Sequence, residues 1–287
     1  MTETSARLTV PKTYKLFIGG AFPRSESGRT YQALAADGSF LANAALASRK
    51  DARDAVVAAR AAVGKWAGAT AYNRGQVLYR VAELLEGRAA QFIAEIEEAQ
   101  GVSREVAQAQ VEASIDAWVW YAGWADKYAQ VAGNANPVAG PYFNISVPEP
   151  TGVVALVAPQ DSSLLGLVQV IAPALVAGNT VIVVAAERLP RSAISLAEVL
   201  ATSDVPGGVV NILTGSPAEI VPHLAAHADV NALDLTGAGA LDWVGLEIAA
   251  ADTLKRVIRP EPDASPTLNR ILAFTETKTV WHPKSML

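Results

Sequence analysis

The sequence predicts an α/β fold organised around a parallel sheet. Residues 153–157 and 180–184 are two short, almost entirely apolar runs rich in β-branched side chains, as expected for strands that a parallel sheet buries on both faces. The stretch between them, 164–177, suits an apolar helix that Gly178 and Asn179 end. A strand, a helix and a second strand in this order form a βαβ unit, which makes the two strands parallel.

The chain before this unit predicts a small β element followed by helices. Residues 15–22 alternate apolar and small side chains like a strand, and residues 30–34 are a candidate return strand. Apolar residues then recur at helical spacing, with serines where helix N-caps are expected. The predicted helices are 48–68, 73–85 and 89–98 (two helices or one kinked helix), and a long helix from Ser103 towards Tyr128.

Helix and strand patterns continue to alternate after the unit. Residues 190–203 and 217–226 read as helices, and residues 209–215 form a strand pattern that ends at a glycine. Before the unit, residues 142–147 alternate in period two ahead of Pro148, which predicts a strand with one polar face. The chain therefore contains at least one further step of the same βα repeat and a separate strand of a different kind.

Composition excludes several classes of function. The 287 residues are 51% hydrophobic and 18% charged, enough for two packed units or one large α/β domain with an appendage. A net charge of −5 without a basic block argues against nucleic-acid and anionic-membrane partners. The chain has no cysteine, so disulfides, thiolate metal sites and a cysteine nucleophile are all excluded.

Neither secretion nor a membrane span is expected. Residues 1–15 lack an apolar core of signal-peptide length, so we expect a cytoplasmic protein. Residues 164–186 are apolar enough to suggest a transmembrane segment, but Pro173, Gly178 and Asn179 interrupt them. A globular βαβ unit explains these interruptions, and we therefore expect no membrane partner.

The βαβ unit resembles the aldehyde dehydrogenase superfamily. That family has a strand, P-W-N, an apolar helix ending in I-A-P-A-L-x-x-G-N-T, and a strand ending in K-P-A-E, and the helix motif is complete at 171–180. P-W-N, however, is Pro159-Gln160-Asp161 here, and K-P-A-E has become 184–187, Val-Ala-Ala-Glu. The segments KLFIGG and SGRTY near the N-terminus also look like the opening of these enzymes.

The runs SRKDARDAVVAAR at 48–60 and GATAYNRGQVLYRVAELLE at 68–86 resemble one branch in particular, the non-catalytic second module of two-module aldehyde dehydrogenases, and this likeness spans the N-terminal half. This resemblance implies a detached accessory subunit with a Rossmann-like sheet, N-terminal helices and a β oligomerisation arm. Residues 265–273 look like the family's next strand and lead directly into residues 274–281, which look like its C-terminus. The intervening catalytic domain is therefore expected to be missing. The expected units are 1–133 (strands and helices packing on the sheet), 134–150 (arm), 151–272 (degenerate NAD-binding domain) and 273–287 (terminal oligomerisation strand).

The resemblance implies that catalysis is lost, and we assign no catalytic residue. The family's asparagine in P-W-N donates to the developing oxyanion, where Asp161 places an opposing carboxylate. Residues 254–258 resemble the strand before the general base, but that base position falls on Pro260. Glu261 is a poor substitute because a one-residue slip turns a strand side chain to the opposite face.

The resemblance leaves cofactor binding open. The lysine of K-P-A-E, which lies near the adenosine ribose in the family, is Val184 here, whereas the glutamate survives as Glu187. Thr236 and Gly237 match the family's strand and turn F-T-G-S-T-E-V-G beside the nicotinamide. These three matching positions, Glu187, Thr236 and Gly237, are the candidate cofactor-binding residues of a degenerate NAD(P) site.

Three other residue groups each have a structural alternative. Glu219, His223 and His227 share a helix face and could bind a metal, but no further ligand is evident and we expect none. Ser162 or Ser163 could be a nucleophile, but a role as helix N-cap fits better because no G-x-S-x-G motif is present. The aromatic stripe Trp120, Trp124 and Tyr128 fits core packing better than a ligand platform.

The sequence thus predicts a catalytically silent aldehyde-dehydrogenase-like subunit. It would assemble with itself or with a full-length aldehyde dehydrogenase. The alternative is an NAD(P)-binding oxidoreductase or sensor of the same family, and a third possibility is a hydrolase that uses Ser162 or Ser163.

Overall fold

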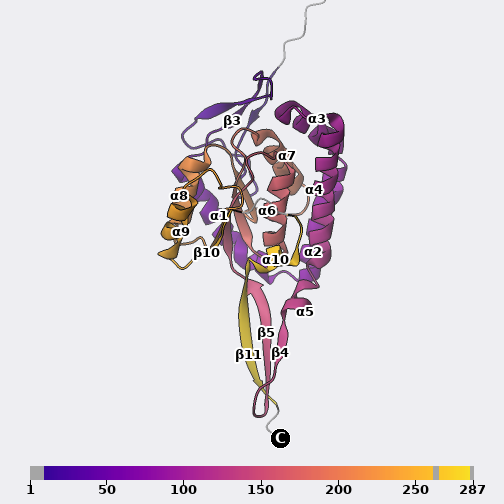
Figure 1. Ribbon diagram of the computed structural model, residues 1–287, viewed down its shortest axis with the longest axis vertical. Helices are drawn as coiled ribbons and strands as arrows, with labels where there is room; N and C mark the ends of the chain where they lie inside the picture. Colours follow the sequence, from indigo (N-terminus) through magenta and orange to yellow (C-terminus); the bar gives the residue numbers. More distant parts are fainter. Residues whose placement is uncertain (1–9, 261–264, 285–287) are drawn as a thin grey trace, which may run out of the picture.

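The computed structural model describes residues 10–260 and 265–284 as a sheet flanked by helices, from which a narrow β arm extends (Figure 1). Its centre is a five-stranded parallel sheet with the spatial order β10-β9-β6-β7-β8. The strands are β6 (Val153–Val157), β7 (Thr180–Val184), β8 (Val210–Leu213), β9 (Ala232–Asp234) and β10 (Arg256–Ile258). The predicted α/β class and parallel βαβ unit are confirmed, and the order is that of a Rossmann-like sheet.

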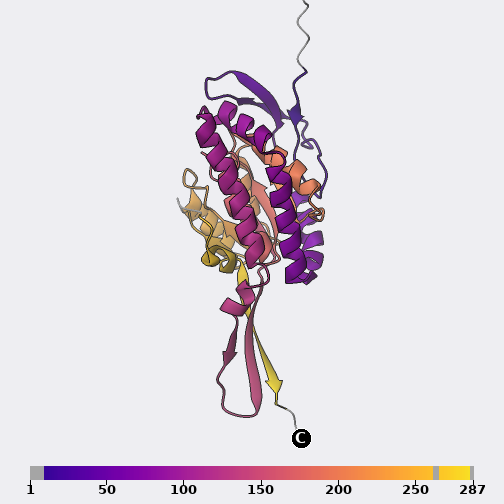
Figure 2. The same cartoon turned by 90° about the vertical axis from the view of Figure 1, so that its right-hand side faces the viewer.

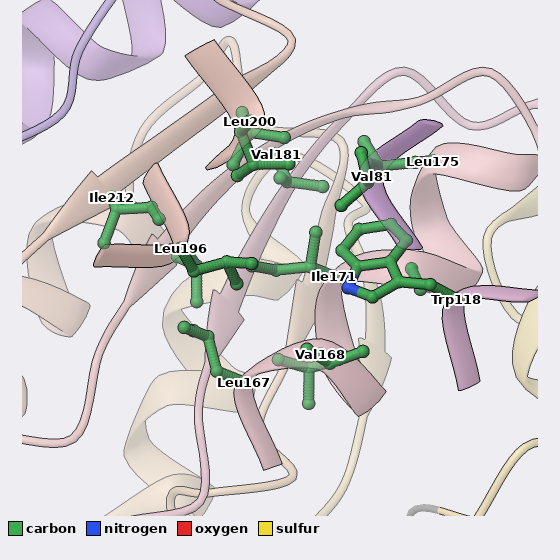
Figure 3. Packing of buried hydrophobic residues seen from close by; sticks show 14 of the residues in the cluster. Val81, Trp118, Leu167, Val168, Ile171, Leu175, Val181, Leu196, Leu200 and Ile212 are labelled. Carbon is green, nitrogen blue, oxygen red and sulfur yellow. The ribbon is translucent and has the colours of Figure 1, made fainter. Parts of the chain in front are cut away.

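Helices cover both faces of this sheet, as its all-buried strands require. Side chains alternate along β6, so that Val154 and Leu156 join one hydrophobic cluster while Val153 and Ala155 join another. The first cluster includes residues of α2 (Ala71–Glu86), α4 (Arg104–Trp124) and the later helices α6 and α7 (Figure 3). The second includes residues of α1 (Arg49–Gly68) and the later helices α8 and α9. The four helices that follow the sheet strands are α6 (Leu165–Val176), α7 (Pro190–Ala201), α8 (Pro217–Ala225) and α9 (Trp243–Ala251).

Two of the N-terminal helices, α1 and α4, begin at the serines that the sequence indicated as N-caps. Ser48 and Asp51 form a capping box at the start of α1, and the Ser103 hydroxyl accepts a hydrogen bond from Val106 N–H at the start of α4. The long helix is shorter than predicted, because it ends at Trp124 and Tyr128 opens a separate short helix. The bounds are α1 (Arg49–Gly68), α2 (Ala71–Glu86), α3 (Ala89–Gln100), α4 (Arg104–Trp124) and α5 (Tyr128–Ala132).

The N-terminal β element differs from its prediction. It is a three-stranded sheet of β1 (Thr13–Tyr14), β2 (Thr30–Leu34) and β3 (Phe40–Ala45), in which β2 pairs with β3. Residues 15–22 are not a strand, because Gly19 and Gly20 adopt positive φ angles of 64° and 83° and turn the chain sharply. The segment contributes only isolated bridges, one of which joins Phe17 to Ile212 at the edge of the central sheet.

The arm is an antiparallel sheet that projects from the end of the body (Figure 2). Its strands, in the order β11-β5-β4, are β4 (Asn134–Asn136), β5 (Tyr142–Pro150) and β11 (Thr275–Pro283). Pairing runs without interruption from Thr275 opposite Pro150 at the root to Pro283 opposite Tyr142 at the tip. Residues 265–273, expected to be a strand, instead contain the helix α10 (Leu268–Leu272), which the Thr267 hydroxyl caps.

In the described part of the chain, no helix combines the length and the apolar character needed to cross a membrane.

Candidate functional site

The candidate site lies at the carboxyl edge of the central sheet, between β6 and β9. Chain direction around the sheet reverses there, since β7 and β8 follow β6 on one side and β9 and β10 lie on the other. Ligands of open α/β sheets bind at such a switch point, outside the carboxyl ends of the strands. The loop after β6 carries Asp161, the loop after β7 carries Glu187, and the turn after β9 carries Thr236 and Gly237.

The three predicted cofactor residues share this edge but do not contact one another as a unit. Thr236 and Gly237 follow β9 and Glu187 follows β7, with β6 between the two strands. No hydrogen bond or ion pair joins Glu187 to either residue in the described ranges. Each of the three has local partners instead.

Gly237 allows two strand ends to approach closely. Its N–H donates to the carbonyl of Val157 across 2.9 Å, and a Cβ at this position would lie 2.0 Å from the carbonyl oxygen of Ala158. Any side chain would therefore push the end of β9 away from β6. The structure gives this glycine a packing role that does not depend on a cofactor.

Thr236 belongs to a buried polar cluster that the sequence did not predict. Its hydroxyl donates to Asp234 Oδ1 across 2.6 Å, and Arg270 of α10 donates to Asp234 Oδ2 across 2.8 Å and to the Thr236 hydroxyl across 3.2 Å. All three side chains are buried. A charged aspartate within an apolar strand was the available sequence signal. Its partner lies 36 positions away and was identifiable only from the fold.

Glu187 is half-buried beside the N-terminal hairpin. Its N–H donates to Gln160 Oε1 across 3.0 Å, while Gln160 Nε2 donates to the Ala158 carbonyl across 2.7 Å. Gln160, which replaces the tryptophan of the family motif, therefore ties the ends of β6 and β7 together. Burial and the nearby charge of Glu187 raise the pKa of the Tyr31 phenol on β2 above its ordinary value.

The serines after β6 have structural partners. Ser162 Oγ accepts a hydrogen bond from the Gly166 N–H across 2.9 Å in the first turn of α6, as expected of a serine that binds a free N–H of this turn. The N-cap position itself is occupied by Leu164 and not by either serine. Ser163 is buried, and its hydroxyl accepts a hydrogen bond from Gln100 across 2.7 Å. Neither serine is hydrogen-bonded to a histidine in the described residues, so the hydrolase alternative has no geometric support.

His227 of the metal alternative and the tryptophans of the aromatic stripe have structural contacts. Within the described ranges, no three histidine, aspartate or glutamate side chains are placed to hold a metal ion, and His227 Nδ1 accepts from the Asp229 N–H. The rings of Trp120 and Trp124 lie 5.6 Å apart and pack against the larger hydrophobic cluster. Glu261, the disfavoured base, lies outside the described residues, so the structure does not test it.

Two surface clefts lie on the face covered by α1, α8 and α9. A cleft of about 570 Å³ between α1 and α8 includes Lys50 and Arg53, but these cations pair with the neighbouring carboxylates Glu26 and Asp54. A second cleft, of about 390 Å³, lies between α8 and α9 and has mainly apolar walls. Its rim carries Asp242, whose carboxylate accepts from the Gly245 N–H and so occupies the N-terminus of α9.

The α9 terminus matters because a free helix N-terminus attracts phosphate. Here a carboxylate already neutralises it, so the positive end of the dipole is not available to a pyrophosphate. The apolar cleft alone would suit a flat ring. A dinucleotide that placed its phosphates at this helix terminus would bring them near the like charge of Asp242.

Comparison with known proteins identifies the family of the chain. The sequence model described as "Aldehyde dehydrogenase family" matches residues 23–259. The chain belongs to the aldehyde dehydrogenase family. Mouse cytosolic 10-formyltetrahydrofolate dehydrogenase is 35% identical over 260 residues, which cover 88% of this chain and 28% of the mouse protein. An aldehyde dehydrogenase from Aspergillus niger is 30% identical over 277 residues, covering 93% of this chain and 55% of the fungal protein.

Solved structures with the same fold include an aldehyde dehydrogenase. HpcC from Thermus thermophilus superposes with a TM-score of 0.79 at 32% identity, covering 86% of this chain and 47% of that protein. An NAD+ complex of the Bacillus cereus aldehyde dehydrogenase gives the same TM-score at 27% identity, with coverages of 86% and 50%. The chain thus spans from about a quarter to about half of the length of the aldehyde dehydrogenases it matches.

Family membership allows the residues at the carboxyl edge to be compared with the family motifs. The residues that differ from the family motifs are found at the carboxyl edge: Gln160 and Asp161 after β6, and Val184 at the end of β7. Val184 is fully buried and packs with the second hydrophobic cluster, so it presents no cation to the edge. The chain contains no cysteine, the residue type that serves as a thiolate nucleophile.

Proposed function

We propose that this chain is a catalytically silent aldehyde-dehydrogenase-like subunit that acts in oligomer assembly, with a second copy of itself or with a full-length aldehyde dehydrogenase. The observation that carries this proposal is the arm. A nine-residue strand pair projects from the body although the carboxyl edge has lost its chemistry. A protruding sheet with free strand edges is an aggregation liability unless it has a partner.

The two faces of the arm differ in a way that favours binding. On one face Asn136 donates to Asn144 and Ser146, and Ser146 shares a hydrogen bond with Thr279, so the polar side chains satisfy one another. On the other face, the side chains of β5 are apolar and open to solvent. They are Phe143, Ile145 and Val147.

The apolar side chains of β5 on this face are exposed to solvent and are not packed in a hydrophobic core. Burial of such a face against another subunit contributes roughly 25 cal/mol per Å² of apolar surface. Strand addition at the arm edges would add backbone hydrogen bonds, which supply affinity without requiring a particular sequence. Both contributions favour a structural partner over a small-molecule ligand.

The silent character rests on the missing groups. The family reaction needs a thiolate nucleophile, and the chain contains no cysteine. The oxyanion-donor position holds the exposed carboxylate of Asp161, and the base position holds Pro260. The three absences together support a subunit without activity of its own.

The test is co-purification of the tagged full chain from its native cell, combined with light scattering of the pure protein. Ile145→Lys places a charge on the apolar face of the arm and is expected to abolish the complex. The matched control is Thr277→Lys, which adds the same charge on the opposite, polar face of β11. A chain that remains monomeric and recovers no aldehyde dehydrogenase would contradict the proposal.

The alternative function is binding of NAD(P) as a sensor or weak oxidoreductase, and the apolar cleft between α8 and α9 favours it. The cleft lies beside the carboxyl edge, and the similar Bacillus cereus enzyme was solved with NAD+. Isothermal titration separates the two functions. Micromolar affinity for NAD(P) would support the alternative, and no heat at millimolar cofactor would remove it.

A further inference from the structure

A pocket with three cationic side chains lies in the N-terminal sheet of β1, β2 and β3, at the end of the body opposite the arm (Figure 1). It has a volume of about 250 Å³, and residues of all three strands and of the turn before β2 line it. The cations are Lys15, Arg24 and Arg29, and no aspartate or glutamate of the described chain is among the lining residues. Positive charge is therefore concentrated here on a chain whose net charge is −5.

None of the three cations forms an ion pair within the ranges that the structure describes. Lys15 and Arg24 make no side-chain hydrogen bond there, and the Arg29 side chain donates only to the Ser27 hydroxyl. All three residues are exposed, so each charge by itself is an ordinary surface charge. Together, three like charges around one pocket repel one another unless an anion lies between them.

A main-chain hydrogen bond brings two of the cations together. The Leu16 N–H donates to the Pro23 carbonyl across 3.1 Å. Lys15 precedes the donor and Arg24 follows the acceptor, so the two cations lie on adjoining segments. Because the bond joins backbone atoms, this placement does not depend on either cationic side chain.

Arg29 approaches from the opposite side of β3. In the sheet β3 lies between β1 and β2, and Tyr14 of β1 and Thr30 of β2 pair with neighbouring residues of β3. Adjacent strands are about 4.8 Å apart, so the backbones of Lys15 and Arg29 are held roughly 10 Å apart. Long, flexible side chains can bridge this separation and contact one ligand between them.

Two carboxylates of the adjoining segments are engaged elsewhere. Asp51 is buried, and its oxygens accept hydrogen bonds from the Ser25 hydroxyl and from the Glu26 and Ser48 N–H groups. The Glu26 side chain accepts from the Ser48 hydroxyl and from Lys50, and it lines the cleft between α1 and α8. Neither carboxylate neutralises the pocket, so its cations remain available to a ligand.

Two guanidinium groups and one ammonium group suit a phosphate. Arginine presents a planar fork of donors that binds phosphate oxygens in pairs, and lysine adds a compact charge. The volume is below the roughly 300–1,000 Å³ of pockets that enclose drug-sized ligands. A compact phosphate compound therefore fits better than a dinucleotide.

We infer that the pocket formed by Lys15, Arg24 and Arg29 is a binding site for a compact phosphorylated ligand. The anion replaces the mutual repulsion of three like charges with charge-assisted hydrogen bonds. The pocket contains none of the residues at the carboxyl edge of the central sheet, so the site requires neither the assembly function nor NAD(P) binding.

Titration calorimetry of the full chain with inorganic pyrophosphate at low ionic strength tests the site. Lys15→Gln and Arg24→Gln are each expected to raise the Kd at least about tenfold, because each removes a charge-assisted contact. The matched control is Lys50→Gln, which removes a nearby cation that already pairs with Glu26 and should leave the Kd unchanged. No heat at millimolar pyrophosphate, or an equal loss in the control, would overturn the inference.

Thermal melting without ligand separates a binding role from a structural one. Arg24→Gln relieves repulsion and breaks no ion pair of the described chain, so its Tm should equal or slightly exceed that of the wild type. A lower Tm would assign the arginine to the fold instead. Pyrophosphate should raise the Tm of the wild type and of Lys50→Gln, but not that of Arg24→Gln.

Two further measurements establish the place and the ligand class. Amide NMR signals of Gly28 and Thr30, which line the pocket, should shift when pyrophosphate is added. Shifts confined to Gly245 would place the anion at the α9 terminus and contradict the assignment. Citrate, a carboxylate anion of comparable charge, should bind more weakly than pyrophosphate, and equal affinity would refute a phosphate site.

Discussion

Arg270 and Asp234 form a buried ion pair with an Nη2–Oδ2 distance of 2.8 Å. The aspartate ends β9 and the arginine lies on α10, just before the arm strand β11. The pair therefore joins the carboxyl edge of the central sheet to the segment that leads into the arm. Because both side chains are buried, neither charge can exchange its partner for water without cost.

Breaking this pair should be strongly destabilising. Arg270→Ala leaves the Asp234 carboxylate buried with only Thr236 as its neighbour donor in the described cluster, and we expect a loss of about 3–5 kcal/mol in the free energy of unfolding. Urea denaturation measures it. Replacement of both residues, as Asp234→Leu with Arg270→Met, should recover most of the loss, because no charge is then buried alone. A loss below about 1 kcal/mol in the single variant would be inconsistent with a buried pair.

Gly237→Ala should destabilise the sheet at the switch point. The added methyl would overlap the Ala158 carbonyl oxygen, so the ends of β6 and β9 must separate, at a cost of about 1–3 kcal/mol. Gly239→Ala, two residues later, has open space around its Cβ and is the control. Thermal melting compares them, and equal melting temperatures for both variants would refute the packing role of Gly237.

Asn179 joins the root of the arm to the sheet and should tolerate little change. Its Nδ2 donates to the carbonyls of Ala174 and Phe274 at 3.0 and 2.9 Å, and its Oδ1 accepts from the Gly152 N–H. Asn179→Leu leaves three backbone groups without these partners, and we expect a loss of at least about 2 kcal/mol. Hydrogen exchange should show the first residues of β11 losing protection. Unchanged exchange there would show that the arm root does not depend on this amide.

Tyr121 should make the protein sensitive to alkaline pH. Burial raises the pKa of its phenol to about 12. The folded state therefore holds the proton more tightly than the unfolded state, and this contribution, present below about pH 10, is lost as the pH rises towards 12. The loss amounts to about 2–3 kcal/mol, because one pKa unit corresponds to about 1.4 kcal/mol. Tyr121→Phe should show a shallower decline in alkaline urea titrations, and an identical slope would contradict this assignment.

Asp242 should select against phosphate in the α8–α9 cleft. Asp242→Ser keeps a capping oxygen for the Gly245 N–H but removes the charge from the helix terminus. If the cleft binds nucleotides, the variant should bind ADP about two- to fivefold more tightly, from the 0.3–1 kcal/mol typical of charges at helix ends. Adenosine, which has no phosphate, is the matched ligand and should bind both proteins equally. Titration calorimetry measures both affinities, and a gain for adenosine as well would exclude an electrostatic cause.

The sequence predicted the regular parts of the fold and missed those set by long-range packing. β6, β7 and the start of α1 lie where their apolar runs and the Ser48 cap indicated, since these signals are local. Residues 15–22 and 265–273 were wrongly predicted as strands. The first is turned by two glycines, and the second packs as a helix under the arm.

The candidate site was predicted in part. Glu187, Thr236 and Gly237 lie at the same edge of the sheet, because the strands that precede them are parallel, but β6 separates Glu187 from the other two. Their local roles could not be foreseen. The partners that define those roles, Gln160, Ala158 and Arg270, depend on how strand ends and a distant helix pack together.

By itself the sequence determined the α/β class, the family resemblance and the absence of cysteine from the chain, because apolar periodicity, motif residues and composition require no coordinates. Only the tertiary structure decided that Asp234 has a buried cationic partner and that Asp242 occupies a helix terminus. It also decided that the rings of Tyr142 and Trp281 meet at the far end of the arm. These relationships join residues far apart in the chain, and their distances are set by packing and not by sequence spacing.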